Sequence, residues 1–102
     1  MADRQRLAAI LALDIEDYAS FETSNKKAAL FHLRSLLEVV RTAVDENRGT
    51  LFSVERDIFL AEFPNPVAAI RAGTMIHENV AAYNDEQKEA QRMSFRAAVH
   101  VG

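Results

Sequence analysis

Two apolar runs, each meeting an aspartate, constrain the fold of this chain more than any other feature. The first covers about Leu7 to Asp14, and the second runs from Ile58 to Phe63 directly after Asp57. Short apolar runs bounded by polar turn residues are typical of buried β-strands. Asp14 is therefore expected at the carboxyl end of one strand and Asp57 at the start of another. Antiparallel neighbours would bring the two carboxylates together, as a divalent cation with its preference for oxygen ligands requires.

Two helices are predicted between and after these strands. Apolar residues recur at helical spacing from Ala28 to Val44, and this helix should end near Asn47 because Gly49 supplies a stop. Asn65 followed by Pro66 predicts the N-cap and first position of a second helix.

Two further strands complete the set. Thr50 to Val54 is β-branched and aromatic, and with Ile58 to Phe63 it predicts a hairpin. Asn84 to Gln91 is polar and predicts a loop or a fraying helix end. The alternation from Met93 to Val101 then predicts a strand with one buried face.

The predicted element order, β-α-β-β-α-β, indicates an α+β fold. It fits a ferredoxin-like sandwich, with a four-stranded antiparallel sheet and two helices on one face. The first and third strands would be antiparallel neighbours at the centre, which places Asp14 beside Asp57. The 102 residues, 49 % of them apolar, predict a single domain over residues 1–102.

Several residues outside the two runs carry expectations about burial. His32 and His77 are expected at surface or boundary positions of helices, and His100 on the polar face of the last strand. The phenylalanines expected in the core are Phe31, Phe52, Phe59, Phe63 and Phe95.

Charge and composition exclude several classes of function. A net charge of −3 and a pI near 5.6 argue against a nucleic-acid partner, which usually requires a basic patch. The absence of cysteine excludes disulfides and thiolate metal sites. We see no secretory signal and no apolar stretch long enough for a membrane span, so the sequence predicts a cytoplasmic protein.

Three short motifs follow one another in a recognisable order. Asp14 to Tyr18 is similar to a strand-ending aspartate followed by an apolar residue, a glycine and an aromatic residue. Arg56 to Phe63 is similar to a glycine-aspartate-glycine turn before an apolar strand, and Phe95 to Gly102 to an arginine, apolar, glycine, apolar, histidine, any residue, glycine motif. Together they resemble, in degenerate form, the N-terminal half of the class III adenylate and guanylate cyclase catalytic domain.

The resemblance implies a metal site at the two aspartates. In this family two aspartates and a backbone carbonyl hold two Mg²⁺ or Mn²⁺ ions, which bind the nucleoside triphosphate and activate the ribose 3′-hydroxyl for attack on the α-phosphate. Carried over by motif, the metal ligands would be Asp14, the carbonyl of Ile15, and Asp57. The simpler alternative is that both carboxylates only accept hydrogen bonds from turn amides.

The residues implied in substrate binding depart from the family pattern. Ser53 stands where the family has its first purine-selecting lysine, and Asp17 and Tyr18 stand at the glycine and aromatic after the first aspartate. Arg56 and Ile58 replace both glycines of the hairpin turn, and a β-branched residue resists positive φ, so the turn should have another shape. As an alternative to a cation, the Arg56 guanidinium could bridge the carboxylates.

The family's later catalytic motifs lie beyond the one that ends at Gly102. The resemblance therefore implies a partial or degenerate nucleotide cyclase domain in signal transduction, whose family chemistry converts ATP to cyclic AMP and pyrophosphate. We expect no catalysis by this part alone, and association with itself, as a dimer or larger homo-oligomer, or with a cyclase-like partner chain. The alternatives are a metal-dependent module that binds ATP or GTP, and half of an active adenylate cyclase completed by another segment.

Overall fold

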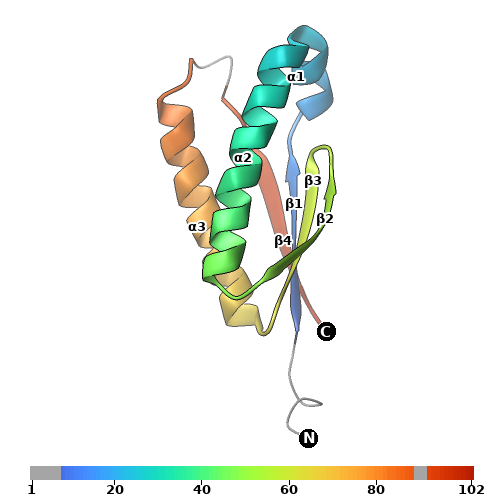
Figure 1. Cartoon of the computed structure of the whole chain (residues 1–102), viewed down its shortest axis with the longest axis vertical. Helices are drawn as coiled ribbons and strands as arrows, with labels where there is room; N and C mark the ends of the chain where they lie inside the picture. The colour runs from blue at the N-terminus through green and yellow to red at the C-terminus, as the bar shows by residue number, and fades with distance from the viewer. Residues whose placement is uncertain (1–7, 89–91) are drawn as a thin grey trace, which may run out of the picture.

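The computed structural model describes residues 8–88 and 92–102 and contains one antiparallel sheet covered by helices on one face (Figure 1). The sheet has the order β2-β3-β1-β4, and its strands are β1 (Ala9–Ile15), β2 (Thr50–Glu55), β3 (Ile58–Phe63) and β4 (Phe95–Val101). The helices are α1 (Tyr18–Ser24), α2 (Lys26–Glu46) and α3 (Pro66–Asp85). The predicted α+β sandwich is confirmed, with the long helices α2 and α3 over the sheet. Leu7 and Gln91, which bounded predicted segments, lie outside the described residues.

Helix α1 was not predicted. It is seven residues long, and only Tyr18 among them is buried, so it carries no apolar periodicity that a sequence pattern could reveal. The hydroxyls of Thr23 and Ser24 donate to the carbonyls of Ala19 and Ser20, one turn earlier. The segment therefore forms a helix of its own before α2 begins.

The two long helices begin at asparagine caps. The Asn25 side chain accepts a hydrogen bond from the Ala28 amide at 3.1 Å, and the Asn65 side chain accepts one from the Ala68 amide at 2.8 Å. Pro66 occupies the first turn of α3, where its missing N–H costs nothing. The predicted start of α3 is confirmed.

Helix α2 ends near the predicted position, but the residue with the left-handed backbone that ends it is not the predicted glycine. Arg48, not Gly49, has the left-handed conformation, with φ 63°. The Arg48 amide donates to the Asp45 carbonyl and the Gly49 amide to the Val44 carbonyl, at 3.3 and 2.8 Å, as in a Schellman motif. Gly49 is needed for space, because a Cβ there would lie 2.5 Å from the ring of Phe63.

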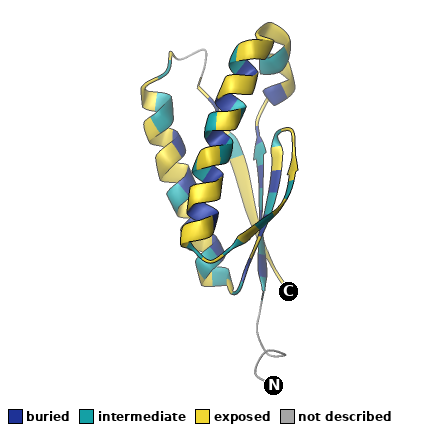
Figure 2. Cartoon of the chain, in the orientation of Figure 1, coloured by how far each residue is buried: buried dark blue, intermediate teal, exposed yellow. Residues whose placement is uncertain are grey.

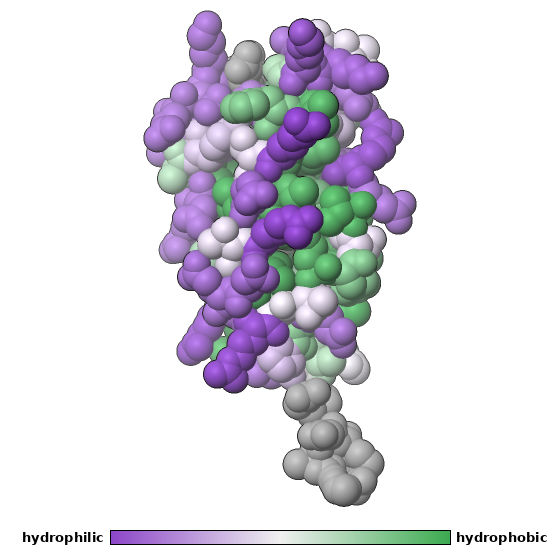
Figure 3. Space-filling view, in the orientation of Figure 1, coloured by the Kyte–Doolittle hydropathy of each residue, from purple (hydrophilic) through white to green (hydrophobic). Residues whose placement is uncertain are grey.

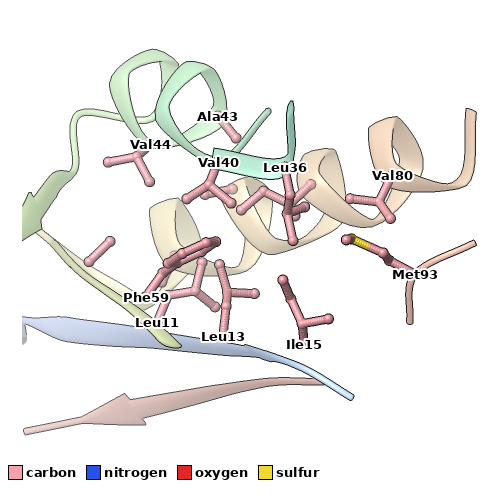
Figure 4. Close-up of a cluster of buried hydrophobic side chains, with 14 of the residues drawn as sticks. Leu11, Leu13, Ile15, Leu36, Val40, Ala43, Val44, Phe59, Val80 and Met93 are labelled. Carbon is pink, nitrogen blue, oxygen red and sulfur yellow. The ribbon is translucent and has the colours of Figure 1, made fainter. Parts of the chain in front are cut away.

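The core lies between the sheet and the helices, and strand alternation decides its membership (Figure 4). Leu11, Leu13 and Ile15 of β1 point into it, as do Phe59 and Phe63 of β3. Figure 2 shows buried and exposed bands along the two long helices, where buried positions recur at helical spacing.

The expectations for the phenylalanines are partly wrong. Phe59 and Phe63 are buried and Phe95 packs against the core, as predicted. Phe31 and Phe52 are instead 63 % and 51 % exposed. Phe52 lies where the pairing of β2 with β3 shifts register, between Leu51 and Ser53, and no residue of β3 is its partner in the ladder.

His32, predicted at a surface or boundary position, is buried, and this expectation was wrong. Its Nδ1 forms a hydrogen bond with the Tyr83 hydroxyl, which ties α2 to α3. The rings of Phe21 and Phe31 lie beside the imidazole, at centroid distances of 5.8 and 5.4 Å. His77 is exposed, as predicted.

The other face of the sheet, called the open face below, is not covered by the described helices (Figure 1). Register and alternation place on it Ile10, Ala12 and Asp14 of β1, Ile58, Leu60 and Glu62 of β3, and Arg96, Ala98 and His100 of β4. Over the described residues, no helix has both the length and the apolar character needed to cross a membrane.

Candidate functional site

The end of β1 meets the tip of the β2–β3 hairpin at one end of the sheet (Figure 1). The Ile15 amide donates to the Asp57 carbonyl at 3.1 Å, and Asp14 lies opposite Ile58 in the ladder. The side chain of Ile15 points into the core, so only its backbone is available at this end (Figure 4). The predicted antiparallel pairing of the two central strands is confirmed, and it brings the two aspartate-bearing segments together.

Asp14 is paired with an arginine that the sequence did not single out for this role. Arg96 stands opposite Asp14 in the β1–β4 ladder, and its Nε and Nη2 donate to Oδ1 and Oδ2 of Asp14 at 3.1 and 2.9 Å. The hydrogen bond to Asp14, followed by the charge of that carboxylate, raises the pKa of Arg96 above its ordinary value. Both oxygens of the first predicted metal ligand are therefore hydrogen-bonded to a cation that belongs to the protein.

Arg56 does not bridge the two aspartates, and that alternative was wrong. Its guanidinium pairs with Glu22 of α1. Its backbone has φ 54°, the left-handed conformation that a glycine would adopt most easily, whereas Ile58 begins β3 outside that conformation. The left-handed conformation thus occurs at Arg56, which replaces the first glycine of the family's turn. Ile58, the β-branched residue that replaces the second, does not adopt it.

Asp17 also holds a conformation that favours glycine. Its φ and ψ are 56° and 26°, and it precedes α1 without a side-chain capping bond. Its carbonyl accepts from the Phe21 amide at 3.1 Å and so starts the helix. Aspartate tolerates this region better than most residues, so the left-handed turn after β1 forms without a glycine.

Tyr18 joins the turn after β1 to the hairpin tip. Burial raises the pKa of the Tyr18 hydroxyl above its ordinary value of 10.0, the negative charges of Glu22 and Asp57 raise it further, and Arg56 opposes them. The side chain of Tyr18 is buried and belongs to the hydrophobic core.

Ser53 lies on the open face at the far edge strand. It pairs with Leu60, which in turn pairs with Ala12 of β1. Asp14 belongs to the neighbouring row of the same face, with Ile58 and Glu55. Ser53 and Asp14 therefore share a face without being adjacent.

Two hollows flank the end of β1. One, of about 320 Å³, lies on the open face between β3 and β4 and is lined by alanines together with Asp14, Ile58 and Arg96. The other, of about 390 Å³, lies at the turn after β1 and includes Glu16, Asp17 and Arg92. The first hollow places open space directly beside the Asp14–Arg96 pair.

Asp14, Asp57 and the Ile15 backbone bring carboxylate and carbonyl oxygens to this end of the sheet, and hard cations such as Mg²⁺ prefer oxygen ligands. Within the described ranges no cluster of three or more histidine, cysteine, aspartate or glutamate side chains is arranged to hold a metal. Mg²⁺ usually takes only one or two carboxylates and completes its shell with water and substrate phosphates. The binding of a cation by Asp14, Asp57 and the Ile15 carbonyl belongs to the proposed function; among the described residues, their side chains do not form a cage for a cation alone.

Comparison with known proteins identifies the class to which this fold belongs: the chain has the fold of class III adenylate and guanylate cyclase domains. The Adenylate/Guanylate Cyclase/Hydrolase from Silicibacter pomeroyi matches with a TM-score of 0.83 and 24 % identity, over 95 % of this chain and 57 % of that one. A bacterial light-regulated adenylyl cyclase matches with a TM-score of 0.84 and 13 % identity, over 95 % and 54 %. The resemblance inferred from the three motifs is confirmed.

In sequence, the chain is 30 % identical over 100 residues to "Putative adenylate cyclase 3" of Rhizobium meliloti (strain 1021). The match covers 97 % of this chain and 17 % of that protein. No protein-family model matches the chain. The chain therefore spans little more than half of the solved cyclase domains and a small part of the curated relative.

Proposed function

We propose that this chain forms part of a nucleotide cyclase domain in which Asp14, Asp57 and the Ile15 carbonyl hold Mg²⁺ or Mn²⁺ together with the triphosphate of ATP or GTP. The observation that carries the proposal is the hydrogen bond between the Ile15 amide and the Asp57 carbonyl, which joins the two segments. The left-handed backbone at Asp17 and Arg56 supports it, because both turns keep a glycine-like shape although the glycines are replaced.

The chemistry is an intramolecular phosphoryl transfer. The bond between the ribose 3′-oxygen and the α-phosphorus forms, the bond from that phosphorus to the bridging oxygen breaks, and pyrophosphate leaves with the electron pair. When bound, the cations neutralise the phosphates and favour loss of the hydroxyl proton. Asp14 and Asp57 would orient them, and Asp17 and Ser53 would lie on the nucleotide side, whereas Tyr18, buried in the core, would support the turn after β1.

Catalysis is proposed to require association with another copy of this chain or with a cyclase-like partner chain. The chain spans 54–57 % of the two solved structures described above. We therefore propose that the rest of a cyclase domain is needed for cyclase activity. Figure 3 shows hydrophobic surface where the β2–β3 hairpin lies, and Phe52, Val54 and Ile58 there are exposed. An apolar, exposed hairpin is suited to an interface. The proposed setting is cytoplasmic signal transduction.

The cation site is tested by titrating isotope-labelled protein with Mn²⁺, with and without ATP, and recording paramagnetic broadening by NMR. We expect selective broadening around Ile15 and Asp57, strengthened by ATP and lost in Asp14→Asn. Asp45→Asn is the matched control, because it removes the same charge from an exposed position near the end of α2. Broadening that survives Asp14→Asn but not Asp45→Asn would place the ion elsewhere and refute the site.

A second candidate is a module that binds nucleotide with metal but does not turn it over. The same carboxylates favour it, since they need no further catalytic residue to hold a cation. Mixing the chain with the C-terminal half of a related cyclase domain separates the two functions. Formation of cyclic nucleotide that depends on Asp57 supports the cyclase, whereas ATP binding without product supports the binding module.

A further inference from the structure

We propose that Arg96 competes with the divalent cation for the Asp14 carboxylate, so that the Asp14–Arg96 ion pair must open before the cation binds. Arg96 would thereby set the cation concentration at which the site fills. This inference rests on the proposed cation site, and it concerns a control that the site carries within this chain.

The geometry of the ion pair supports direct competition. The two bonds, at 3.1 and 2.9 Å, engage one oxygen each, which is the two-pronged geometry that suits a guanidinium to a carboxylate. A divalent cation coordinated by the same oxygens would lie within a few ångströms of the guanidinium. Two like charges at that separation repel each other, so cation and guanidinium cannot both be held closely by Asp14.

The pair is able to open. The side chain of Arg96 is 67 % exposed and that of Asp14 is 34 % exposed, and exposed ion pairs are weak because water competes with both partners. The hollow of about 320 Å³ beside the pair gives the released guanidinium room to move.

A released guanidinium would find other carboxylates on the neighbouring turn. Glu16 and Asp17 follow Asp14 by two and three positions, just after the end of β1. On its other flank in the ladder, Asp14 has Ile58, which carries no charge. Arg96 is therefore the cationic side chain set against Asp14 from the neighbouring strands, and the turn carboxylates can accept it when the cation takes its place.

The test measures Mn²⁺ affinity by NMR broadening in the wild-type chain and in Arg96→Gln, Arg96→Lys and Arg41→Gln. We expect Arg96→Gln to bind Mn²⁺ about two- to five-fold more tightly, the range that an exposed ion pair allows. Arg96→Lys, which keeps the charge but loses the two-pronged geometry, should fall between. Arg41→Gln, which removes the same charge from an exposed position of α2, should match the wild type. In an Asp14→Asn background, where the broadening is lost, Arg96→Gln should not restore it.

The other outcomes refute either the competition by Arg96 alone or the cation site itself. Equal affinity in Arg96→Gln and Arg41→Gln refutes competition but leaves the cation site standing. Weaker binding in Arg96→Gln also refutes it, since Arg96 would then support the site. If none of the variants binds Mn²⁺, or if Asp14→Asn does not weaken binding, the proposed cation site fails and the competition fails with it. The amide spectrum of each variant shows whether it is folded, independently of Mn²⁺.

Discussion

The two faces of the sheet differ in how deeply their side chains are buried and in how many of them are charged. On the face under the helices, the side chains of the central strands β1 and β3 are apolar and almost completely buried, whereas the open face mixes apolar residues with charged ones that stay partly exposed. Strand β3 shows the difference between neighbours: Phe59 is 1 % exposed and Ile58 is 47 % exposed. Because alternate residues of a strand point to opposite faces, one strand can contribute to the buried core and to the exposed open face.

The difference separates stability from chemistry. The covered face supplies the close packing that holds β1 and β3 side by side. The open face carries Asp14, Arg96 and the hollow beside them, and its charges remain near water. We therefore expect mutations on the covered face to act on folding and mutations on the open face to act on binding.

The strongest test of this comparison uses two neighbouring residues of β3. Phe59→Ala should lower the free energy of unfolding by about 3–5 kcal/mol, because it removes a buried ring and leaves a cavity. Ile58→Ala should lower it by no more than about 1 kcal/mol, since half of that side chain is already in water. Urea denaturation followed by circular dichroism measures both. Equal losses would mean that the open face is packed as tightly as the covered one.

A second test adds volume. Gly49→Ala should destabilise the protein by about 1–3 kcal/mol, because the new methyl group would overlap the buried ring of Phe63. Ala98→Val adds more atoms, but on the open face, and should change stability by about 0.5 kcal/mol or less. Thermal denaturation of the two variants under one set of conditions decides the matter. A Gly49→Ala protein as stable as the wild type would show that the covered face yields easily near Phe63.

The smallest expected effect concerns the hairpin tip, which belongs to neither face. Arg56→Ala and Arg56→Gly remove the same ion pair with Glu22, so they differ only in how they tolerate φ 54°. The glycine variant should be more stable than the alanine variant by about 1 kcal/mol. Their denaturation midpoints give this difference directly. If the Arg56→Ala protein is as stable as the Arg56→Gly protein, the backbone at position 56 does not need the left-handed conformation for the hairpin to form.

Much of the fold could be predicted from local pattern. The positions of the strands followed from apolar runs and alternation, and the start of α3 followed from Asn65 and Pro66, because these signals act over a few residues. The buried face predicted for the last strand was wrong, because β4 is exposed on both faces from Arg96 to Val101. The pairing of β1 with β3 followed from the element order. The short helix α1 could not be predicted, because one buried residue in two turns leaves no period to detect. Phe52 was misplaced because its apolar side chain alone suggested burial, whereas the register shift in β2 leaves it without a partner on β3.

The candidate site was predicted in part. Asp14 and Asp57 follow from their places beside two apolar runs, and the resemblance to cyclases assigned them a role. The sequence pointed to Arg56 as the nearby cation, since it adjoins Asp57 in the chain, but that residue turned out to pair with Glu22. The arginine that reaches Asp14 is Arg96.

By itself, the sequence determined the type and order of the main elements, the alternation of the central strands and the location of the two aspartates. These properties depend on neighbours within a few positions of each other. Only the tertiary structure decided that Arg96 pairs with Asp14, that His32 bonds to Tyr83, and that Phe63 leaves no room for a side chain at Gly49. The residues of the first pair are 82 positions apart and those of the second are 51 apart. Such partners meet only when strand register and helix packing are set, and no local pattern encodes the result.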